Sequence, residues 1–414
     1  MGKMERVLSE KSPNIQRKQP YIGVILALLL LFYCLDFFFR IAPSVVVHPL
    51  IQQYHITALG MGGFASAFYL GYAIMQIPSG AILDRFRFTL AMAVAIVICV
   101  LTFIGFLLVS QYWAGYGLRL VIGAASAFSF VGVLTLARQY FDPKYFSFIA
   151  GIAIGAGTIA ASGVQVLGAW AMNFWPWHAV LIVASLFGLV IAGLLLLPYF
   201  KLPKRQAMQS PREWSAFKSI MLQPILLTNA IVGGLFYLPT TIFASLWGVP
   251  FLEQDYGLTR IQAATGIMWL FIGWAIGAPI IGYWAERLKH YHRLMTVGAL
   301  LGFAVSLIMI YGQWFSGVEV WILLLVFGVA SSAQAGVWKV FHEHAPQQMI
   351  GLGVAVTNMI IMLAGVIFHV VVGWLLTLGV FNRANGSINY HLGLVIIPIS
   401  FFVVALLAFT LRRR

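Results

Sequence analysis

Charged residues are scarce in this chain. Asp, Glu, Lys and Arg together make up 9% of its 414 residues, whereas soluble domains carry about 25%. Hydrophobic residues reach 61%, and the mean hydropathy is +0.94. This composition excludes an ordinary soluble domain and predicts an all-α membrane protein with many spans.

Acidic residues are the scarcer charged kind, with 11 Asp and Glu against 25 Lys and Arg. In a soluble protein the resulting net charge of +14 would favour nucleic-acid binding. Here the basic residues gather in short segments between apolar runs, as the positive-inside rule describes. We therefore expect no nucleic-acid partner.

Cysteine is rarer still, and common cofactor motifs are missing. Cys34 and Cys99 both fall within apolar runs, which argues against a disulfide framework. The nearest approach to a metal motif is His342-Glu343-His344, but residues two apart point to different sides of a helix. The sequence also lacks a phosphate-binding loop. We predict no metal, no cofactor and no ATP-driven activity.

Twelve apolar runs are each long enough to cross a bilayer, which takes about 20 residues. The expected spans are residues 21–43, 58–83, 89–109, 114–139, 146–170, 177–197, 221–250, 261–285, 294–313, 318–341, 349–378 and 392–410. The predicted parts are a basic tail (1–20), a six-helix bundle (21–197), a basic linker (198–220), a second six-helix bundle (221–410) and a short tail (411–414).

The distribution of Lys and Arg predicts an orientation. With the N-terminus inside, the basic segments face the cytoplasm, and only Arg260 and Arg383 fall in outer loops. We expect a monomeric, multi-pass protein of the cell inner (plasma) membrane, surrounded by the lipid bilayer, with both termini cytoplasmic. The first 20 residues are polar and basic, so no cleavable signal peptide is expected.

The two halves of the sequence repeat each other. Gly71-Tyr72-Ala73-Ile74 matches Gly273-Trp274-Ala275-Ile276, and Gly80 with Asp84-Arg85 matches Gly282 with Glu286-Arg287, always 202 positions apart. Gly123 has a looser counterpart in Gly328. Two pseudo-symmetric six-helix bundles predict a binding site between them, near the midplane, that opens alternately to each side.

At this point the chain resembles the major facilitator superfamily. Gly80-x-x-x-Asp84-Arg85 is similar to the signature of that family's second loop, although the expected Gly after Phe86 is missing. Arg119 followed by Gly123 resembles the family's buried-arginine motif. The glycines at 151, 155 and 157 lie where antiporters of the family carry a Gly-x-x-x-Gly-Pro motif, and the absent Pro argues against export.

The resemblance implies a cytoplasmic gate in which acidic and basic side chains bond neighbouring helices in one state only. Its residues would be Gly80, Asp84, Arg85, Gly282, Glu286 and Arg287. The alternative is that these charges only anchor the helix ends at the cytoplasmic surface.

A narrower resemblance concerns the first two spans. Phe37-Phe38-Phe39-Arg40, then Pro43-Ser44-Val45 and Gln76-Ile77-Pro78, resemble a bacterial branch akin to lysosomal dipeptide carriers. Nutrient carriers of intracellular bacteria are similar. This resemblance implies amino acids or small peptides as substrates.

Three charges lie inside the apolar runs. Asp36 and Arg40 are one helical turn apart on the same face of span one, and Arg119 lies at a similar depth in span four. Buried charges face a partner or a wet cavity and are functional by default. We expect a network in which Asp36 carries a proton and the surplus guanidinium charge binds a substrate carboxylate or phosphate. The alternative is an Asp36–Arg119 or Asp36–Arg40 pair that only fixes helix packing.

Further polar and aromatic residues are candidates for the wall of the site, each with packing as its alternative role. In the first half they are Tyr33, Tyr69, Tyr72 and Gln165; in the second half they are Asn229, Tyr237, Thr240, Trp269, Gln334, Trp338, Asn358 and His369. Gly233-Gly234 and Pro239 predict a hinge in span seven.

Together these features predict a secondary active transporter working by alternating access. The favoured function is proton-coupled uptake of a small carboxylate-bearing solute, such as an amino acid, short peptide or related metabolite. Efflux of an amphipathic compound and uncoupled facilitation are the alternatives within transport. A membrane-embedded sensor would need a larger soluble region, and an enzyme would need clustered acids or metal ligands within the spans, so we predict no enzyme.

Overall fold

The computed structural model describes residues 21–142, 145–197, 218, 221–287, 291–312, 317–345, 350–381 and 388–411. The predicted tails and most of the predicted linker lie outside these residues. Within them, twelve helical segments are long and apolar enough to cross a membrane, which confirms the predicted number. The described residues contain no strand.

The spans are built from these elements. The first half contains α2 (Tyr21–Ile41), η1 (Ala42–Val46), α3 (Val47–Tyr54), α4 (Ala58–Arg85), α5 (Phe88–Leu108), α6 (Tyr112–Tyr140), α7 (Phe146–Ala171) and α8 (Trp177–Leu195). The second half contains α10 (Pro224–Leu238), η4 (Pro239–Trp247), α11 (Gly248–Tyr256), α12 (Arg260–Arg287), α13 (Tyr291–Tyr311), α14 (Val318–Ser331), η5 (Ser332–Gln334), α15 (Ala335–His344), α16 (Ile350–Phe381), α17 (Tyr390–Leu394) and α18 (Ile396–Thr410).

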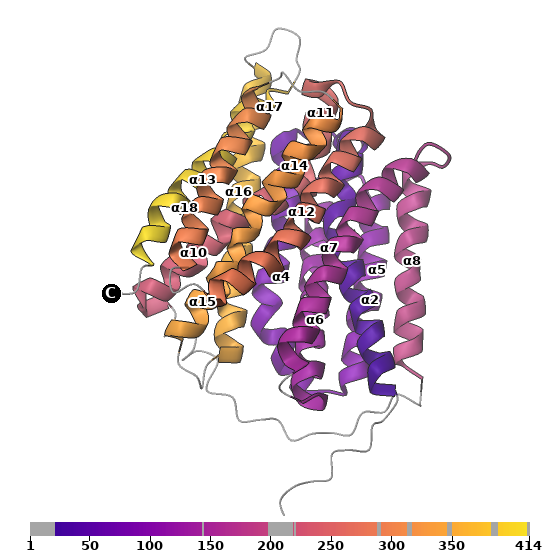
Figure 1. Cartoon of the computed structure of the whole chain (residues 1–414). Helices are drawn as coiled ribbons and strands as arrows, with labels where there is room; N and C mark the ends of the chain where they lie inside the picture. The colour runs from indigo at the N-terminus through magenta and orange to yellow at the C-terminus, as the bar shows by residue number, and fades with distance from the viewer. Residues whose placement is uncertain are drawn as a thin grey trace, which may run out of the picture.

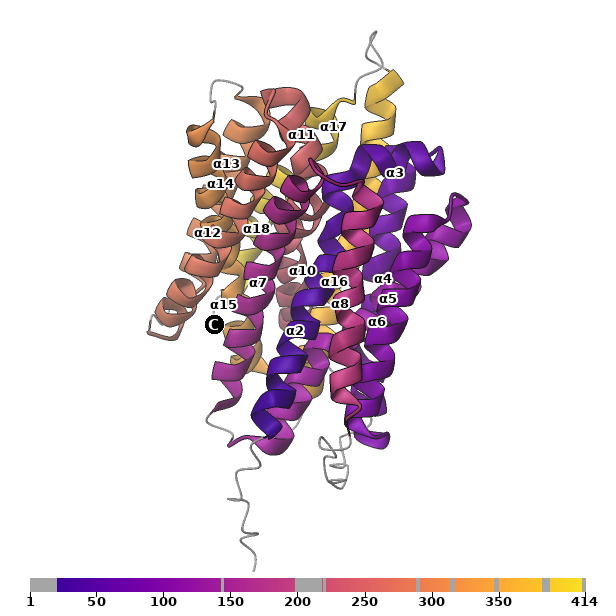
Figure 2. The same ribbon diagram turned by 90° about the vertical axis from the view of Figure 1, so that its right-hand side faces the viewer.

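The two halves of the chain form two bundles that lie side by side (Figures 1 and 2). We call the end of the molecule that carries α3, α11 and α17 the upper end, and the opposite end the lower end. The bundles contact each other through α4 with α16 and through α7 with α12. A hydrogen bond joins them near the upper end, where the backbone N–H of Leu59 donates to Thr377 Oγ1 over 3.0 Å.

Three spans contain a helical segment that is not α-helical, and in two of them this segment includes a proline. In span one the 3₁₀ segment η1 contains Pro43, and in span seven the π-helical segment η4 begins at Pro239. Proline lacks the backbone N–H and crowds the preceding turn, which loosens the helix. The segments η1 and η4 contact each other across the two bundles, and every residue of both is buried. The irregular geometry of span seven begins at Pro239, and α10 remains helical through Gly233 and Gly234.

The repeat found in the sequence is visible in the helices. α4 and α12 begin and end at equivalent positions of the repeat, and each has 28 residues. In both halves a Cβ on a glycine would overlap a backbone carbonyl of the facing helix. The contacts are Gly71 with Leu120, Gly123 with Phe68, Gly273 with Leu325, and Gly328 with Leu270. Glycine thus permits the same close helix approach twice, and the looser Gly123–Gly328 correspondence is a real structural equivalence.

We expect Gly123→Val to destabilise the first bundle by about 1–3 kcal/mol, because the new side chain would push against the backbone of α4. Thermal unfolding of the purified protein in detergent measures this as a lower Tm. Gly117→Val on the same helix is the matched control, since a Cβ at Gly117 meets no atom within 4 Å. Equal Tm values for the two variants would contradict the close approach.

Candidate functional site

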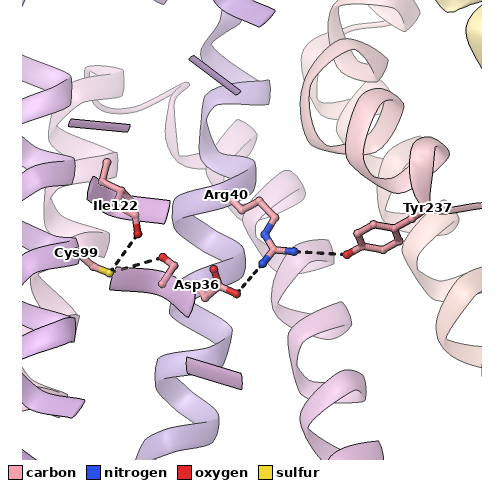
Figure 3. Close-up of polar contacts among 6 residues, drawn as sticks. Asp36, Arg40, Cys99, Ile122 and Tyr237 are labelled. Carbon is pink, nitrogen blue, oxygen red and sulfur yellow. Dashed lines mark hydrogen bonds and ion pairs between the residues drawn. The ribbon is translucent and has the colours of Figure 1, made fainter. Parts of the chain in front are cut away.

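An ion pair between Asp36 and Arg40 lies at the centre of the first bundle. Arg40 Nη2 donates to Asp36 Oδ2 over 2.9 Å, and the two residues sit one turn apart near the end of α2 (Figure 3). Asp36 is 0% and Arg40 6% exposed. The helical spacing recognised in the sequence therefore produces a buried pair, in which the carboxylate and guanidinium compensate each other's loss of hydration.

Arg40 also reaches the second bundle. Its Nη1 donates to the hydroxyl of Tyr237 on α10 over 3.5 Å (Figure 3). The guanidinium carbon lies 4.9 Å from the ring centroid of Phe37 and 5.0 Å from that of Tyr72, with Phe68 and Tyr69 at 5.6 and 5.7 Å. Aromatic faces stabilise a desolvated cation. Arg40 thus connects the acid of the first half to a hydroxyl of the second.

Arg119 has different partners from those expected. Its Nη1 donates to the carbonyl of Phe39 over 2.8 Å, and its Nε donates to the carbonyl of Phe64 over 3.4 Å. Arg119 forms no ion pair with Asp36 or with another acid among the described residues, so the predicted three-residue network is wrong in this detail. Arg119 is only 2% exposed. Its positive charge is therefore buried without a countercharge, held by backbone dipoles and by the ring of Phe68 at 4.9 Å.

Both arginines face one small cavity between the bundles. Its volume is about 10 Å³, which is roughly the room one water molecule needs. The first bundle contributes Arg40, Pro43, Met61, Phe64, Ala65, Tyr69 and Arg119, and the segment η4 of the second bundle contributes Ser245 and Leu246. Of the residues predicted to line the site, Arg40, Arg119 and Tyr69 line this cavity.

Small polar groups of α6 and α5 lie behind the Asp36 carboxyl. The hydroxyls of Ser126 and Ser129 lie near this carboxyl, and Ser126 Oγ is 3.6 Å from the Cys99 thiol, which also lies 3.8 Å from the Ile122 carbonyl (Figure 3). Asp36 Oδ1 and Ser129 Oγ are both buried without a hydrogen-bond partner among the described residues. A buried carboxylate oxygen in this situation is costly while it carries charge. The surroundings of Asp36 therefore leave one oxygen free to take a proton.

Gln165 joins the bundles on the other side of η1. Its Nε2 lies 2.9 Å from both Ser44 Oγ in η1 and the carbonyl of Ala244 in η4. Gln165 is 0% exposed. The irregular backbone of η4 thus supplies a carbonyl to a side chain of the opposite bundle, which is how unwound membrane segments commonly recover lost hydrogen bonds.

The other predicted wall residues divide into two groups. Tyr33 and Tyr72 belong to the aromatic surroundings of Asp36 and Arg40, with Tyr33 packed 5.3 Å from Phe37 and from Phe130. In the second half, the side-chain amides of Asn229 and Gln334 donate to the carbonyls of Val337 and Gly233, each over 2.9 Å. These bonds hold α10 against the tenth span. Trp269, Trp338 and Asn358 are half-buried and lie away from the cavity between the arginines.

His369 of α16 occupies a distinct position. It is 0% exposed, and its ring stacks on Tyr69 of α4 with centroids 5.2 Å apart. Neither ring nitrogen has a hydrogen-bond partner among the described residues. The backbone carbonyl of His369 lies so near Gly62 that a Cβ there would overlap it. This histidine packs where the two bundles meet, next to a wall residue of the cavity.

The residues predicted to form a gate lie at lower helix ends. Asp84 accepts a hydrogen bond from Gln139 Nε2 over 3.0 Å and lies 3.6 Å from Arg138 Nη2, both on α6. Arg85 is exposed, and Arg287 lies over the ring of Tyr283 at 4.4 Å. The side chain of Glu286 lies outside the described residues. A Cβ on Gly80 would meet only Val131, at an ordinary 3.9 Å, and a Cβ on Gly282 would meet no atom within 4 Å.

Sequence reasoning missed several contributors to the site, including Met61, Phe64 and Ala65 of α4 in the cavity wall. Ser245 and Leu246 form the far wall of the cavity, and Ser126 lies behind Asp36. Pro239 indicated a break in this span, but no residue pattern shows which side chains a π-helical turn will direct inward. Among the described residues, no group of three or more His, Cys, Asp or Glu side chains is placed to hold a metal ion.

Comparisons with known proteins agree on one family. A sequence model described as Major Facilitator Superfamily matches residues 26–369. The uncharacterized transporter YybO of Bacillus subtilis (strain 168) is 25% identical over 370 residues, covering 82% of this chain and 83% of that protein. The probable galactarate/D-glucarate transporter GarP of Escherichia coli (strain K12) is 24% identical over 404 residues, covering 87% and 90%.

Solved structures share the fold. A bacterial homologue of the human lysosomal transporter Spinster, in an inward-facing and unoccupied conformation, matches with a TM-score of 0.81 at 16% identity. That match covers 95% of this chain and 97% of the other. The nucleoside transporter NupG matches with a TM-score of 0.69 at 17% identity, covering 94% and 99%.

Proposed function

The chain belongs to the major facilitator superfamily, and on that premise we propose that it takes up small carboxylate-bearing solutes together with protons. It is a multi-pass membrane transporter of the alternating-access type. The proposal extends this to the substrate, the coupling ion and the direction. It also places the protein in the cell inner membrane with both termini, and hence the lower end, in the cytoplasm.

The observation that carries the proposal is the uncompensated charge of Arg119 beside the cavity between the bundles. Holding a guanidinium 2% exposed without a countercharge is costly. A planar guanidinium binds a carboxylate through two parallel hydrogen bonds, so an incoming carboxylate would supply the missing charge. Proteins similar to this chain are probable transporters of galactarate and D-glucarate. Both of these compounds contain carboxylate groups. Sugar diacids therefore join amino acids and short peptides as candidate substrates.

The size of the cavity requires a conformational change. At about 10 Å³ it is far smaller than the pockets of several hundred Å³ that hold small molecules. Two contacts join the bundles and would close the site on the upper side: Leu59 with Thr377 near the upper end, and Gln165 with Ala244 next to the cavity wall. In this proposal the substrate enters after these contacts separate and leaves toward the lower end.

Asp36 is the proposed proton carrier. Its ion pair with Arg40 favours the charged carboxylate, whereas complete burial and the unpartnered Oδ1 favour the neutral acid. Because Arg40 also contacts Tyr237 of the second bundle, the balance between these effects changes when the bundles move apart. Protonation and bundle movement are then linked through one guanidinium group.

The gate at the lower end completes the proposed cycle. Asp84 lies beside Gln139 and Arg138 of its own bundle in this conformation. When the lower ends approach each other, the same carboxylate is available to bond across the bundles. Asp84 and its repeat equivalent Glu286 would thus affect the rate of transport more than the choice of substrate.

We expect Asp36→Asn to abolish proton-driven accumulation in proteoliposomes while leaving substrate exchange, because the amide cannot take up or release a proton. Uptake of a labelled carboxylate, driven by a pH gradient or by internal substrate, measures the two activities. Glu319→Gln, an acid-to-amide change at an exposed position, is the control. Normal accumulation by Asp36→Asn would remove Asp36 from the coupling role.

Arg119→Lys should weaken substrate binding about tenfold or more, since a hydrogen bond to a charged group contributes roughly 1.5–3 kcal/mol and lysine lacks the planar fork. Titration of the purified protein with the labelled substrate gives the Kd. Arg260→Lys, at the exposed pair with Glu253, is the matched control. Unchanged affinity in Arg119→Lys would indicate a packing role.

Gln165→Leu should favour the conformation with an open upper end, because the hydrogen bond from the amide to Ala244 of the second bundle is lost. One net hydrogen bond corresponds to about 0.5–1.5 kcal/mol, or a shift of roughly two- to tenfold. Distances between spin labels at His55 and Val318, exposed positions on the two bundles, report the change. Gln53→Leu is the control, since Gln53 bonds only within the first bundle, to Leu107, Val109 and His178. The same distance distribution in both variants would contradict this role.

A further inference from the structure

We propose that Asp36 sets the charge of the binding site, so that at the binding step a dicarboxylate takes up one proton and a monocarboxylate takes up none. A monocarboxylate would then be coupled to protons at a later step, when the bundles move and the contact of Arg40 with Tyr237 changes. The inference rests on the proposed function and specifies the substrate class and stoichiometry of the same site. It follows from three buried charges and the hydrogen-bond partners of each.

Among the described residues, three side chains of the types Asp, Glu, Lys and Arg are buried. They are Asp36, Arg40 and Arg119. With the 2.9 Å pair formed, Asp36 neutralises Arg40 and the site keeps one uncompensated guanidinium, that of Arg119. When Asp36 is protonated, the site has two uncompensated guanidinium groups, those of Arg40 and Arg119. The site therefore has a net charge of +1 or +2, and the difference is one proton at one carboxyl group.

The hydrogen-bond partners of the two arginines explain why a proton on Asp36 affects Arg40 and leaves Arg119 unchanged. Arg119 is held by the carbonyls of Phe39 and Phe64, which are neutral and stay in place whether Asp36 is charged or not. Arg40 Nη2 has Asp36 as its charged acceptor. Both guanidinium groups face the same cavity. A second carboxylate can therefore bind Arg40 favourably only after Asp36 has lost its charge, since two anions on one side of Arg40 would repel each other.

The other titratable groups around the Asp36 carboxyl do not alter the count near neutral pH. They are phenols and a thiol, which are neutral there. They are Tyr33 on its own helix, Tyr69 and Tyr72 on α4, Cys99 on α5, and Tyr237 on α10. The groups of α6 that lie near this carboxyl are the hydroxyls of Ser126 and Ser129. Arg40 is thus the charged group that responds directly to the proton.

A matched pair of ligands tests the inference. D-glucarate and D-gluconate share one polyhydroxy chain and differ in whether one end is a carboxylate or an alcohol. Calorimetric titration of the full-length protein in two buffers of different ionisation enthalpy counts the protons taken up with each ligand. We expect about one proton for D-glucarate and none for D-gluconate. By linkage, the Kd for D-glucarate should then tighten about tenfold for each unit the pH falls, while Asp36 is ionised in the free protein.

Asp36→Asn fixes the site at a charge of +2. It should bind D-glucarate with no proton uptake and no pH dependence, and at pH 8 more tightly than the unaltered protein does. Glu319→Gln should keep the proton uptake and the pH dependence. If Asp36→Asn does not fold, the number of protons that the unaltered protein takes up with each ligand is sufficient to test the inference.

Binding of D-glucarate by the unaltered protein without proton uptake overturns the inference, as does equal proton uptake with both ligands. Proton uptake that persists in Asp36→Asn also overturns it. Failure of both ligands to bind overturns this inference alone. The proposed function also covers amino acids and peptides and is judged separately by the uptake assay on Asp36→Asn.

Discussion

A guanidinium group buried in an apolar bundle must find polar partners, and much of this site is arranged around that need. Arg119 obtains its hydrogen bonds from the carbonyls of Phe39 and Phe64. Phe39 lies in the last turn of α2, where carbonyls begin to lose their helical partners because η1 follows. The break at Pro43 therefore accounts for one of the two acceptors, the carbonyl of Phe39, beside an arginine that pairs with no acid among the described residues.

Irregular backbone also provides polar contacts where the two bundles meet. The π-helical segment η4 exposes the carbonyl of Ala244 to Gln165, and its Ser245 and Leu246 close the cavity that the arginines face. Irregular backbone at membrane depth is tolerated where protein or a cavity surrounds it. Because the irregular segments of spans one and seven meet, the site lies where the backbone is least constrained and both bundles contribute.

The sequence was sufficient to predict features that depend on composition and periodicity. Twelve spans, a repeat and three buried charges can be recognised because apolar runs, glycine spacing and charges within those runs are local signals. The partners of Arg119 were not predictable, since every residue has a carbonyl and only the fold selects Phe39 and Phe64. Asn229 and Gln334 looked like wall residues for the same reason, because an amide that bonds a neighbouring backbone and one that binds a ligand are identical in sequence.

The two bundles have equivalent helix packing but differ in their buried charged side chains. Gly71 and Gly273 make equivalent backbone contacts, yet the buried ionised side chains of the described residues all belong to the first bundle. The second bundle contributes a phenol at Tyr237, a backbone carbonyl at Ala244 and an apolar wall. An anionic substrate would therefore be held electrostatically by one bundle and contacted by neutral groups of the other. In the proposed function, rocking of the second bundle would then open the site while the charge of the substrate stays bound to the arginines of the first bundle.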